Sequence, residues 1–482
     1  MRAVRDNNLT GNFGSAYSEA ASALATATSY LNDHLTRRKT QEDTFTPGFC
    51  SDYEGAVYIK VFTADDIARR LNYPRARTVI LELNKNLVLD KGLLFDSRYS
   101  CTVLRSNNIT GSVPVFNKSP GVIRVAMSGY GPTLEKSYIA ITNNEVYGVD
   151  TPIVLYQGAI GVIVRNNYVH DFIFAGIRCG ADVHYAADCV LATISYNIVV
   201  AAGTNRSGDQ DAAGIYFCTH WFSPANLAEC NYVFNGDHCY YLDYVTSGVT
   251  VNGGACVGTY DGIKVNNGKW NSIDNIIIKD VAGMPGWCTC FTPTVNNCAK
   301  RPGTYWEAMR KKYYDTPLFR SQWPWWDSVC QDRSIRGKLC NIGRKGTLSG
   351  KQTGYCSGLP TDNFVRLIVA NGTRDMGYKY CEVLPTVEEG TFNKHQMVNL
   401  TDIPSAAFFD YAQNDFGVYK RSSLLKNLPN FKACPRWAVG PRRVDESFYL
   451  ANYNHPMPPA FQLVVNMKTT HIIDRALQAS LK

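Results

Sequence analysis

The sequence predicts an all-β fold, namely a right-handed parallel β-helix solenoid with an N-terminal capping helix and a partly helical insertion rich in cysteine and tryptophan. Two observations lead to this prediction. Between residues 120 and 285, short apolar segments recur at a nearly regular spacing, and a second series of segments that end in asparagine interleaves with them. No helical pattern separates the two series, so a coil of parallel strands accounts for both.

The two series define the period of the coil. The apolar segments begin at five positions separated by 24, 38, 25 and 23 residues: Pro152, Gly176, Gly214, Cys239 and Gly262. The second series ends in Asn144, Asn167, Asn197, Asn231, Asn252 and Asn275. A period of about 22–25 residues fits a solenoid, whereas a propeller blade needs a longer one and a leucine-rich repeat needs more leucines. We expect the asparagines to stack at one corner and bond along the coil, which is a structural role.

The flanking segments indicate the domain organisation. Residues 63–71 predict a capped helix that shields the open end of the coil, with Thr63 as N-cap and Asp66 in the first turn. Five cysteines and five tryptophans between residues 286 and 345 indicate an insertion, after which 363–371 resumes the coil pattern. The expected parts are a polar N-terminal segment (1–45), the cap and first coils (46–120), the β-helix core (121–285), the insertion (286–345), the last coils and closing segment (346–445) and a C-terminal tail (446–482).

Composition excludes several classes of protein. Hydrophobic residues make up 45% of the 482 residues and charged residues 19%, which is too apolar for a disordered chain. No apolar run reaches the length of about 18 residues that a transmembrane helix needs, so membrane insertion is not expected. The net charge of +8 is spread over scattered basic residues, which argues against a nucleic-acid partner and suits an anionic glycan.

Cysteine usage indicates the compartment. The chain has 16 cysteines without a pair of CxxC motifs, which favours disulfides and an oxidising environment over structural zinc. Residues 1–30 show no apolar signal-peptide core, so we expect a secreted protein whose start is incomplete. Six N-x-S/T triplets agree with a secreted glycoprotein: Asn8, Asn108, Asn117, Asn205, Asn371 and Asn399.

Three segments of the core carry a family resemblance. Residues 213–216, 241–250 and 261–268 read AGIY, YLDYVTSGVT and DGIKVNNG. This succession resembles the GAIY, YLDDxTSGxxV and GIxxxGG pattern of right-handed β-helix carbohydrate-active proteins similar to glycoside hydrolase family 141. The helical stretch 305–320 and the closing run 407–431 resemble further parts of that family, so the similarity spans about residues 75–445.

The resemblance implies the fold and an extracellular protein that acts on a polysaccharide or a glycoprotein glycan. The chain differs from the family pattern at two places. Tyr244 follows Asp243 where a second acid is usual, and Asn267 stands in place of a glycine.

Strand alternation gives a separate route to the functional site. Because successive side chains of a strand point to opposite faces, inward Ile177, Ile215, Tyr240 and Ile263 leave a predicted outward row of four residues. That row consists of Arg178, Tyr216, Tyr241 and Lys264. The next outward position holds Gly180, Cys218, Asp243 and Asn266, while His238 and Asp261 precede their strands and Asp209 and Asp211 lie in the turn before Gly214. Aromatic rings stack on sugars and polar groups bond hydroxyls, so we expect a glycan-binding groove bordered by the insertion.

Glycoside hydrolysis needs a protonated acid and a second carboxylate that acts as base or nucleophile. The resemblance favours Asp243 with Asp211, with Asp261 near His238 as the fallback. Arg178, Tyr216, Tyr241, Lys264 and Asn266 are the expected substrate-binding residues, and no cofactor is expected. Asp211 lies seven positions before Asp243 in the aligned frame, about 20 Å of extended chain, so only a folded turn at 203–213 would bring them together.

Two alternatives remain open. A polysaccharide lyase on the same fold would use Lys264, His238, Tyr241 and Arg178, with a basic residue or Ca²⁺ neutralising a uronate carboxylate. A non-catalytic glycan-binding or extracellular structural protein would use the tyrosine face for adhesion alone. Each residue also has a structural interpretation: the acids suit turns, the cations suit ion pairs, and tyrosine rows are common surface cover.

Overall fold

The computed structural model describes the following residues: 50, 56–83, 86–89, 92–105, 108–111, 122–126, 139–148, 150–156, 159–180, 189–190, 192–201, 212–218, 226–243, 246, 249–266, 271–280, 287–290, 317, 364–366, 368–370, 397–418, 422–434, 436 and 439–441. The expected N-terminal segment (1–45), the C-terminal tail (446–482) and nearly all of the expected insertion (286–345) lie outside these residues.

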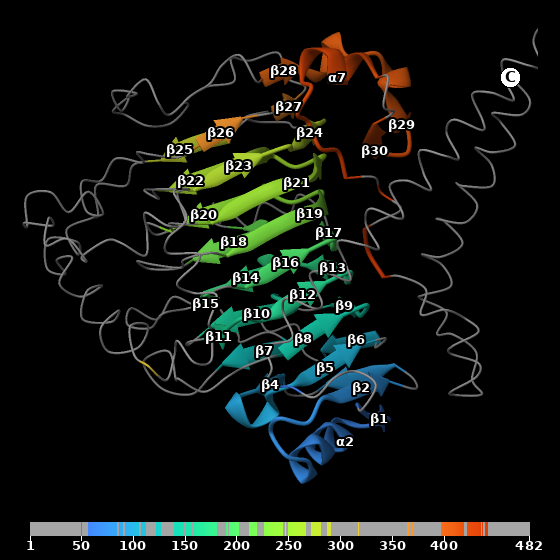
Figure 1. The fold of residues 1–482 in the computed structure, drawn as a ribbon, viewed down its shortest axis with the longest axis vertical. Coiled ribbons are helices and arrows are strands. Elements are labelled where there is room, and N and C mark those ends of the chain that lie inside the picture. The colour runs from blue at the N-terminus through green and yellow to red at the C-terminus, as the bar shows by residue number, and fades with distance from the viewer. Residues whose placement is uncertain are drawn as a thin grey trace, which may run out of the picture.

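The described chain is mostly β-structure in long parallel sheets (Figure 1). One sheet has eight strands, β4 (Leu93–Phe95), β7 (Ile123–Ala126), β10 (Ile153–Tyr156), β14 (Ala175–Cys179), β18 (Ala213–Cys218), β20 (His238–Asp243), β22 (Asp261–Asn266) and β25 (Trp287–Cys290). The predicted all-β class and the parallel strand pairing are therefore confirmed.

The second sheet has eighteen strands in two adjoining stacks. The first stack holds β1 (Val57–Val61), β2 (Val79–Leu83), β5 (Thr102–Arg105), β8 (Ile139–Thr142), β12 (Ile163–Arg165), β16 (Thr193–Ser195), β19 (Leu227–Phe234), β21 (Thr250–Val257), β23 (Ser272–Asp274) and β26 (Phe364–Arg366). The other holds β3 (Leu87–Leu89), β6 (Asn108–Gly111), β9 (Glu145–Tyr147), β13 (Tyr168–Phe172), β17 (Ile198–Ala201), β24 (Ile277–Lys279), β27 (Ile368–Ala370) and β28 (Met397–Asn399), and the long strands β19 and β21 run through both.

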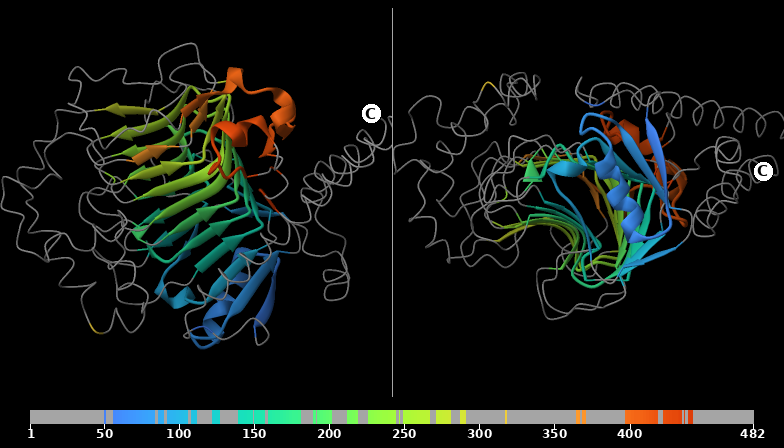
Figure 2. Two further views of the ribbon diagram at one scale, coloured as in Figure 1. Left: turned by 45° about the horizontal axis from the view of Figure 1, so that its top comes forward. Right: turned by 90° about the horizontal axis from the view of Figure 1, so that it is seen from below.

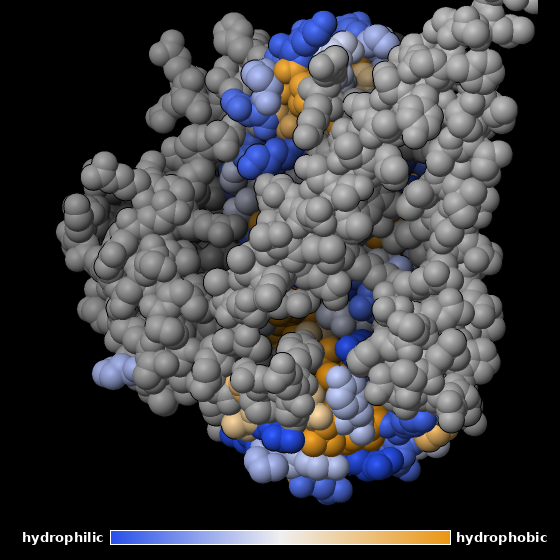
Figure 3. All heavy atoms as spheres, turned by 45° about the vertical axis from the view of Figure 1, so that its right-hand side comes forward, coloured by the Kyte–Doolittle hydropathy of each residue, from blue (hydrophilic) through white to orange (hydrophobic). Residues whose placement is uncertain are grey.

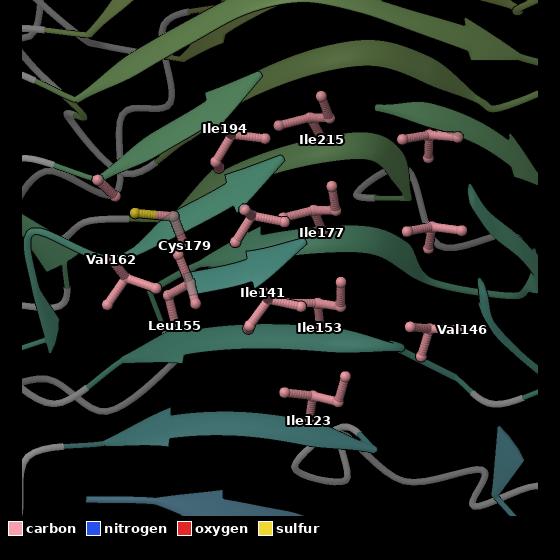
Figure 4. Packing of buried hydrophobic residues seen from close by; sticks show 14 of the residues in the cluster. Ile123, Ile141, Val146, Ile153, Leu155, Val162, Ile177, Cys179, Ile194 and Ile215 are labelled. Atoms are coloured by element: carbon pink, nitrogen blue, oxygen red, sulfur yellow. The ribbon is translucent and has the colours of Figure 1, made fainter. Parts of the chain in front are cut away.

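The core lies between the two sheets (Figure 2). Inward positions align from strand to strand: Ile123 pairs with Ile153, Ile153 with Ile177, and Ile177 with Ile215. Figure 4 shows these isoleucines in one column, facing Ile141 and Ile194 from the larger sheet. β-branched side chains suit this arrangement because they pack well on a pleated surface.

A corner with left-handed backbone joins the two stacks of the larger sheet. Its residues are Asn143, Asn166, Tyr196, Cys230, Gly253 and Asn275, with φ between 53° and 75°. Asparagine and glycine adopt this conformation more readily than other residues, and four of these six corner residues are of those two types.

The asparagine ladder follows this corner and consists of Asn144, Asn167, Asn197 and Asn231. In each step the backbone N–H and Nδ2 of one asparagine donate to Oδ1 of the next, at 2.9–3.0 Å. The predicted stacking is thus confirmed for four of the six asparagines. The next register position after Asn231 is Gly254, where a Cβ would lie 2.1 Å from the Asn231 carbonyl oxygen, so the ladder ends there. Asn252 and Asn275 instead bond to each other at 2.7 Å.

The N-terminal end carries the predicted helix, α2 (Ala64–Ala68), followed by the 3₁₀ turn η2 (Arg69–Asn72). The Thr63 N–H donates to Asp66 Oδ2 at 2.9 Å, which completes the N-terminal cap. A second 3₁₀ turn, η3 (Ser97–Tyr99), lies beside η2. The largest exposed apolar side chains of the described residues belong to this end of the stack, where Figure 3 shows apolar among charged atoms: Tyr58, Phe62, Leu71, Tyr73, Val88 and Leu94.

A C-terminal strap, residues 400–441, packs on the outer face of the larger sheet. It contains η8 (Leu400–Asp402), η9 (Ser405–Ala407), the antiparallel pair β29 (Phe408–Asp410) and β30 (Asp415–Val418), and α7 (Ser423–Asn427). Apolar side chains of the strap form a second buried cluster with Tyr196, Tyr232 and Ile277 of the sheet. The disulfide Cys230–Cys434 fixes the strap, and the Tyr232 hydroxyl donates to the Cys434 carbonyl at 2.5 Å.

Four disulfides occur among the described residues: Cys50–Cys101, Cys179–Cys189, Cys230–Cys434 and Cys239–Cys256. The Cys179–Cys189 bond joins β14 to β15 (Cys189–Val190), which pairs with β11 (Ala159–Ile160). The prediction of disulfides is therefore confirmed. The proposed bonding of Cys298, Cys330 and Cys340 falls outside the described residues. Within the described part of the chain, no helix is long and apolar enough to cross a membrane.

Candidate functional site

The predicted outward row exists as one register position of the eight-stranded sheet. Arg178 pairs with Tyr216, Tyr216 with Tyr241, and Tyr241 with Lys264. The preceding residue of each strand lies in the core, as alternation requires. We keep the name outward row for Arg178, Tyr216, Tyr241 and Lys264.

The four side chains of the outward row stack on one another. The rings of Tyr216 and Tyr241 lie 5.1 Å apart at an interplanar angle of 23°. The Arg178 guanidinium lies 5.4 Å from the Tyr216 ring centroid, and Lys264 Nζ lies 4.3 Å from that of Tyr241. Two cations thus enclose two aromatic rings, an arrangement favoured by the negative potential of the ring faces. Phe174, which sequence reasoning missed, lies 5.3 Å from the Arg178 guanidinium on another side.

Asp243 lies at the end of β20, beside the row. The Tyr216 hydroxyl donates to Asp243 Oδ2 at 2.6 Å, and both residues are buried. Burial, followed by the nearby Cys218 and the Asp243 carboxylate, holds the pKa of Tyr216 well above its usual value of 10.0. Tyr216 therefore remains a hydrogen-bond donor to Asp243 across the physiological pH range.

His238 lies at the other end of β20, between an acid and a base. Its Nδ1 is 3.2 Å from Asp261 Oδ2, within ion-pair distance although the two groups are not aligned as a hydrogen bond. Its Nε2 is 3.5 Å from Lys264 Nζ, and its ring lies 5.2 Å from that of Tyr241. An ammonium can only donate, so this contact is a hydrogen bond only in the tautomer that leaves Nε2 without a proton and carries the ring proton on Nδ1, toward Asp261. The fallback pairing of His238 with Asp261 is present in the structure.

The outward row is a packed layer rather than an open groove. Tyr216 is 1% exposed and Lys264 8%, although both lie outside the inner core. Strand alternation predicted the side on which these residues lie, but it carries no information on what covers them. The most exposed member of the group is Asp261, whose side chain is 13% exposed.

The remaining predicted residues are only partly placed. Asp209 and Asp211 lie outside the described residues, so the pairing of Asp211 with Asp243 stays a prediction. The backbone of Asn266 pairs with Cys290, while its side chain lies outside the described part. Asp261 pairs with His238, and His238 lies five residues before Asp243 on β20. The two acids are therefore about 16 Å apart along the strand direction. That exceeds the separation of about 6.5–9.5 Å that an inverting hydrolase uses.

Comparison with known proteins adds no family assignment: no protein-family model matches the chain, and no curated protein matches it. Among the residues that the structure describes, no group of three or more His, Cys, Asp or Glu side chains is arranged to hold a metal ion. The chemistry proposed for the site therefore depends on the geometry of its own side chains.

Proposed function

We propose that the chain is a right-handed parallel β-helix and that the outward row is its glycan-binding face. The coil-to-coil register, the repeated corner and the asparagine ladder support the fold. The row supports the ligand class through its composition, because the two cations suit acidic groups and the tyrosine hydroxyls suit sugar hydroxyls, while the ring faces are taken by each other and by the cations.

We further propose that the protein cleaves a polysaccharide or a glycoprotein glycan outside the cell. The observation that carries this proposal is the contact chain from Asp261 through His238 to Lys264, next to Tyr241. It brings together a carboxylate, an imidazole whose Nε2 can carry a lone pair, and a cation. Asp261 is the most exposed of these groups, so substrate would approach from its end of the row.

The chemistry that this contact chain supports best is β-elimination on a uronate. His238 Nε2 removes the proton next to the carboxylate, and the electron pair forms the new carbon–carbon double bond as the bond to the leaving oxygen breaks. Lys264 turns from Nε2 to the carboxylate, which frees the Nε2 lone pair and makes that proton more acidic, and His238 later releases the proton it has taken to solvent. The Tyr241 hydroxyl gives a proton to the leaving oxygen and later regains one from solvent.

Hydrolysis is the second candidate, and the hydrogen bond from Tyr216 to Asp243 favours it. A carboxylate held by a neutral donor is suited to act as base or nucleophile. The acid partner would be Asp211, which the family resemblance selects. Among the described acids, Asp261 is too far along the strand to take that role.

Product analysis and matched variants separate these functions. The purified protein is incubated with a panel of neutral and acidic polysaccharides, and new reducing ends and the ultraviolet absorbance of unsaturated uronate are followed. If elimination is correct, both signals rise and His238→Gln lowers turnover by about 10²-fold or more, while Asp243→Asn has a small effect. Thermal unfolding of each variant controls for loss of fold.

Three other results would contradict elimination. New reducing ends without unsaturated product, abolished by Asp243→Asn and not by His238→Gln, would replace elimination by hydrolysis. Binding of a glycan without any product would assign the protein to the non-catalytic glycan-binding class. Full activity of both variants would remove the outward row as the catalytic site.

A further inference from the structure

A second cluster of titratable side chains lies on the larger sheet, away from the outward row. Its centre is His170 in β13, where the register with β17 shifts between His170 and Phe172. This bulge leaves Asp171 in the left-handed region, with φ of 54°. His170 Nδ1 lies 2.8 Å from Asp171 Oδ2, and Nε2 lies 2.9 Å from Glu145 Oε1 on the neighbouring β9.

Two aromatic rings enclose the imidazole. The Tyr147 ring lies 4.7 Å away at an angle of 5°, and the Tyr168 ring lies 4.2 Å away at 25°. Asn108 Nδ2 on β6 donates to Glu145 Oε2 at 2.9 Å, which holds the half-buried carboxylate in place. On the strap side, the positive charge of Arg436 lowers the pKa of Tyr168, against the larger upward effect of burial.

These contacts favour the charged form of the ring. A neutral imidazole has one N–H, so it can donate to one carboxylate only, whereas the imidazolium donates to both. The stacked tyrosine faces add cation–π attraction. Burial lowers the pKa of His170, but the hydrogen bonds and charges of Glu145 and Asp171 outweigh it and raise the pKa above 6.5.

The cluster is connected to the C-terminal strap. Tyr168 packs against the second buried cluster, to which Val439 of the strap belongs. Two bonds join the same corner to the end of the strap: Asn166 Nδ2 donates to the Gly440 carbonyl at 3.0 Å, and the Gly440 N–H donates to the Tyr196 carbonyl at 2.7 Å. Movement of β13 at the bulge therefore reaches the strap through residues in direct contact.

We propose that His170 is a proton-operated latch, which in its charged form ties Asp171 and Glu145 together and holds the strap end against β13. When the ring loses a proton, one carboxylate faces a nitrogen lone pair. Asp171 is the group that leaves, because its side chain is 63% exposed and its backbone is in an unfavourable region, whereas Glu145 stays bonded to Asn108. The strap end would then open more often.

The direction of the pH dependence follows from the raised pKa. The latch contributes its full stabilisation below pH 6.5, where the unfolded and folded chains both carry a charged histidine. It loses that contribution as the pH rises through the pKa of the folded state. The other groups facing the ring are Tyr147 and Tyr168. Burial, and to a smaller degree the carboxylates of Glu145 and Asp171, raise the pKa of both tyrosines, so both stay neutral in this range.

The test is hydrogen exchange followed by mass spectrometry on the full chain between pH 5 and pH 9, corrected for the intrinsic exchange rate. In the wild type, peptides covering 165–172 and 436–441 should lose protection with rising pH, on the order of tenfold for each pKa unit by which His170 exceeds 6.5. Asp171→Asn and Glu145→Gln should reduce this pH-dependent loss, because each removes one of the charges that bind the proton.

The chain supplies a matched control in Asp280. This residue has the same left-handed backbone, with φ of 56°, and a side chain that is 59% exposed, and it neighbours Lys279 at 3.7 Å instead of a histidine. Asp280→Asn should therefore leave the pH dependence at 165–172 unchanged. Protection that does not vary with pH in the wild type would overturn the latch, as would a pKa of 6.5 or lower for His170 in an NMR titration. An equal pH effect in wild type and Asp171→Asn would also overturn it.

Discussion

The asparagine ladder and the outward row are both columns that repeat once per coil, and they differ in how their residues repeat. The ladder keeps one residue type over four positions, and each of its first three members makes the same two bonds to the next. The row keeps its register but changes from Arg178 through two tyrosines to Lys264. A hydrogen bond that recurs in the same form selects the same residue at each step, whereas the outward row keeps its register without keeping one residue type.

The largest effect on stability is expected in the ladder. Replacing Asn197 with Ala leaves the buried Asn167 N–H and the Val164 carbonyl without the partners that the side chain supplies at 2.9 and 3.0 Å. At about 1–3 kcal/mol for each of the two unsatisfied groups, the free energy of unfolding should fall by about 2–6 kcal/mol. Urea denaturation measures this, with exposed Asn72→Ala as the control expected to stay within about 0.5 kcal/mol of wild type.

The activity of Asn197→Ala tests whether the ladder also contributes to the proposed function. If the ladder is purely structural, the folded fraction of Asn197→Ala should keep the substrate turnover of wild type. A change in turnover per folded molecule would show that the two columns are not separate in function.

A smaller loss is expected in the row from Tyr216→Phe. This change removes the hydroxyl that donates to Asp243 Oδ2 and leaves the ring stack intact. Because the lost bond involves a buried carboxylate, the free energy of unfolding should fall by about 1.5–3 kcal/mol. Denaturation measures the loss, and Tyr73→Phe, at an exposed position, serves as its control. An unchanged stability would mean that Tyr216 is not needed to hold Asp243.

The smallest effect concerns an asparagine outside both columns. Asn108 lies in an N-x-T triplet, yet it is 7% exposed and its Nδ2 is bonded to Glu145. A glycan on that nitrogen would remove the bond and could not be accommodated in β6. Peptide mapping of protein produced in a glycosylating host should therefore show Asn108 unmodified, and a glycosylated Asn108 in folded protein would contradict this placement of β6.

Periodicity allowed much of the fold to be predicted. The five predicted strand starts lie within one residue of β10, β14, β18, β20 and β22, and 363–371 indeed resumes the coil as β26 and β27. Register follows from such a pattern because a shift of one residue would move the whole apolar set out of the core. The disulfide partner of each cysteine could not be predicted from the sequence, because sixteen cysteines allow many pairings and only the fold brings Cys230 to Cys434.

The position of the candidate site could be predicted from the sequence, but the burial of its side chains could not. Alternation placed His238 one coil from Asp261 and Tyr216 one coil from Tyr241, while the burial of the row depends on segments that alternation does not describe. The His170 cluster was missed, although Glu145 and His170 are 25 residues apart, the length of one coil. Searching polar residues at the period of the apolar ones would have found it.

The bond between Cys230 and Cys434 has a consequence for synthesis of the protein. Its two cysteines are 204 residues apart, which corresponds to about 10–40 s of translation at about 5–20 residues per second. During that interval the nascent chain carries the Cys230 thiol without its partner, next to Tyr232 and the apolar face that the strap later covers. A chaperone that shields this face and an oxidant that acts late would both favour the correct bond, and a chain that ends before residue 434 would keep its Cys230 thiol open to a wrong partner.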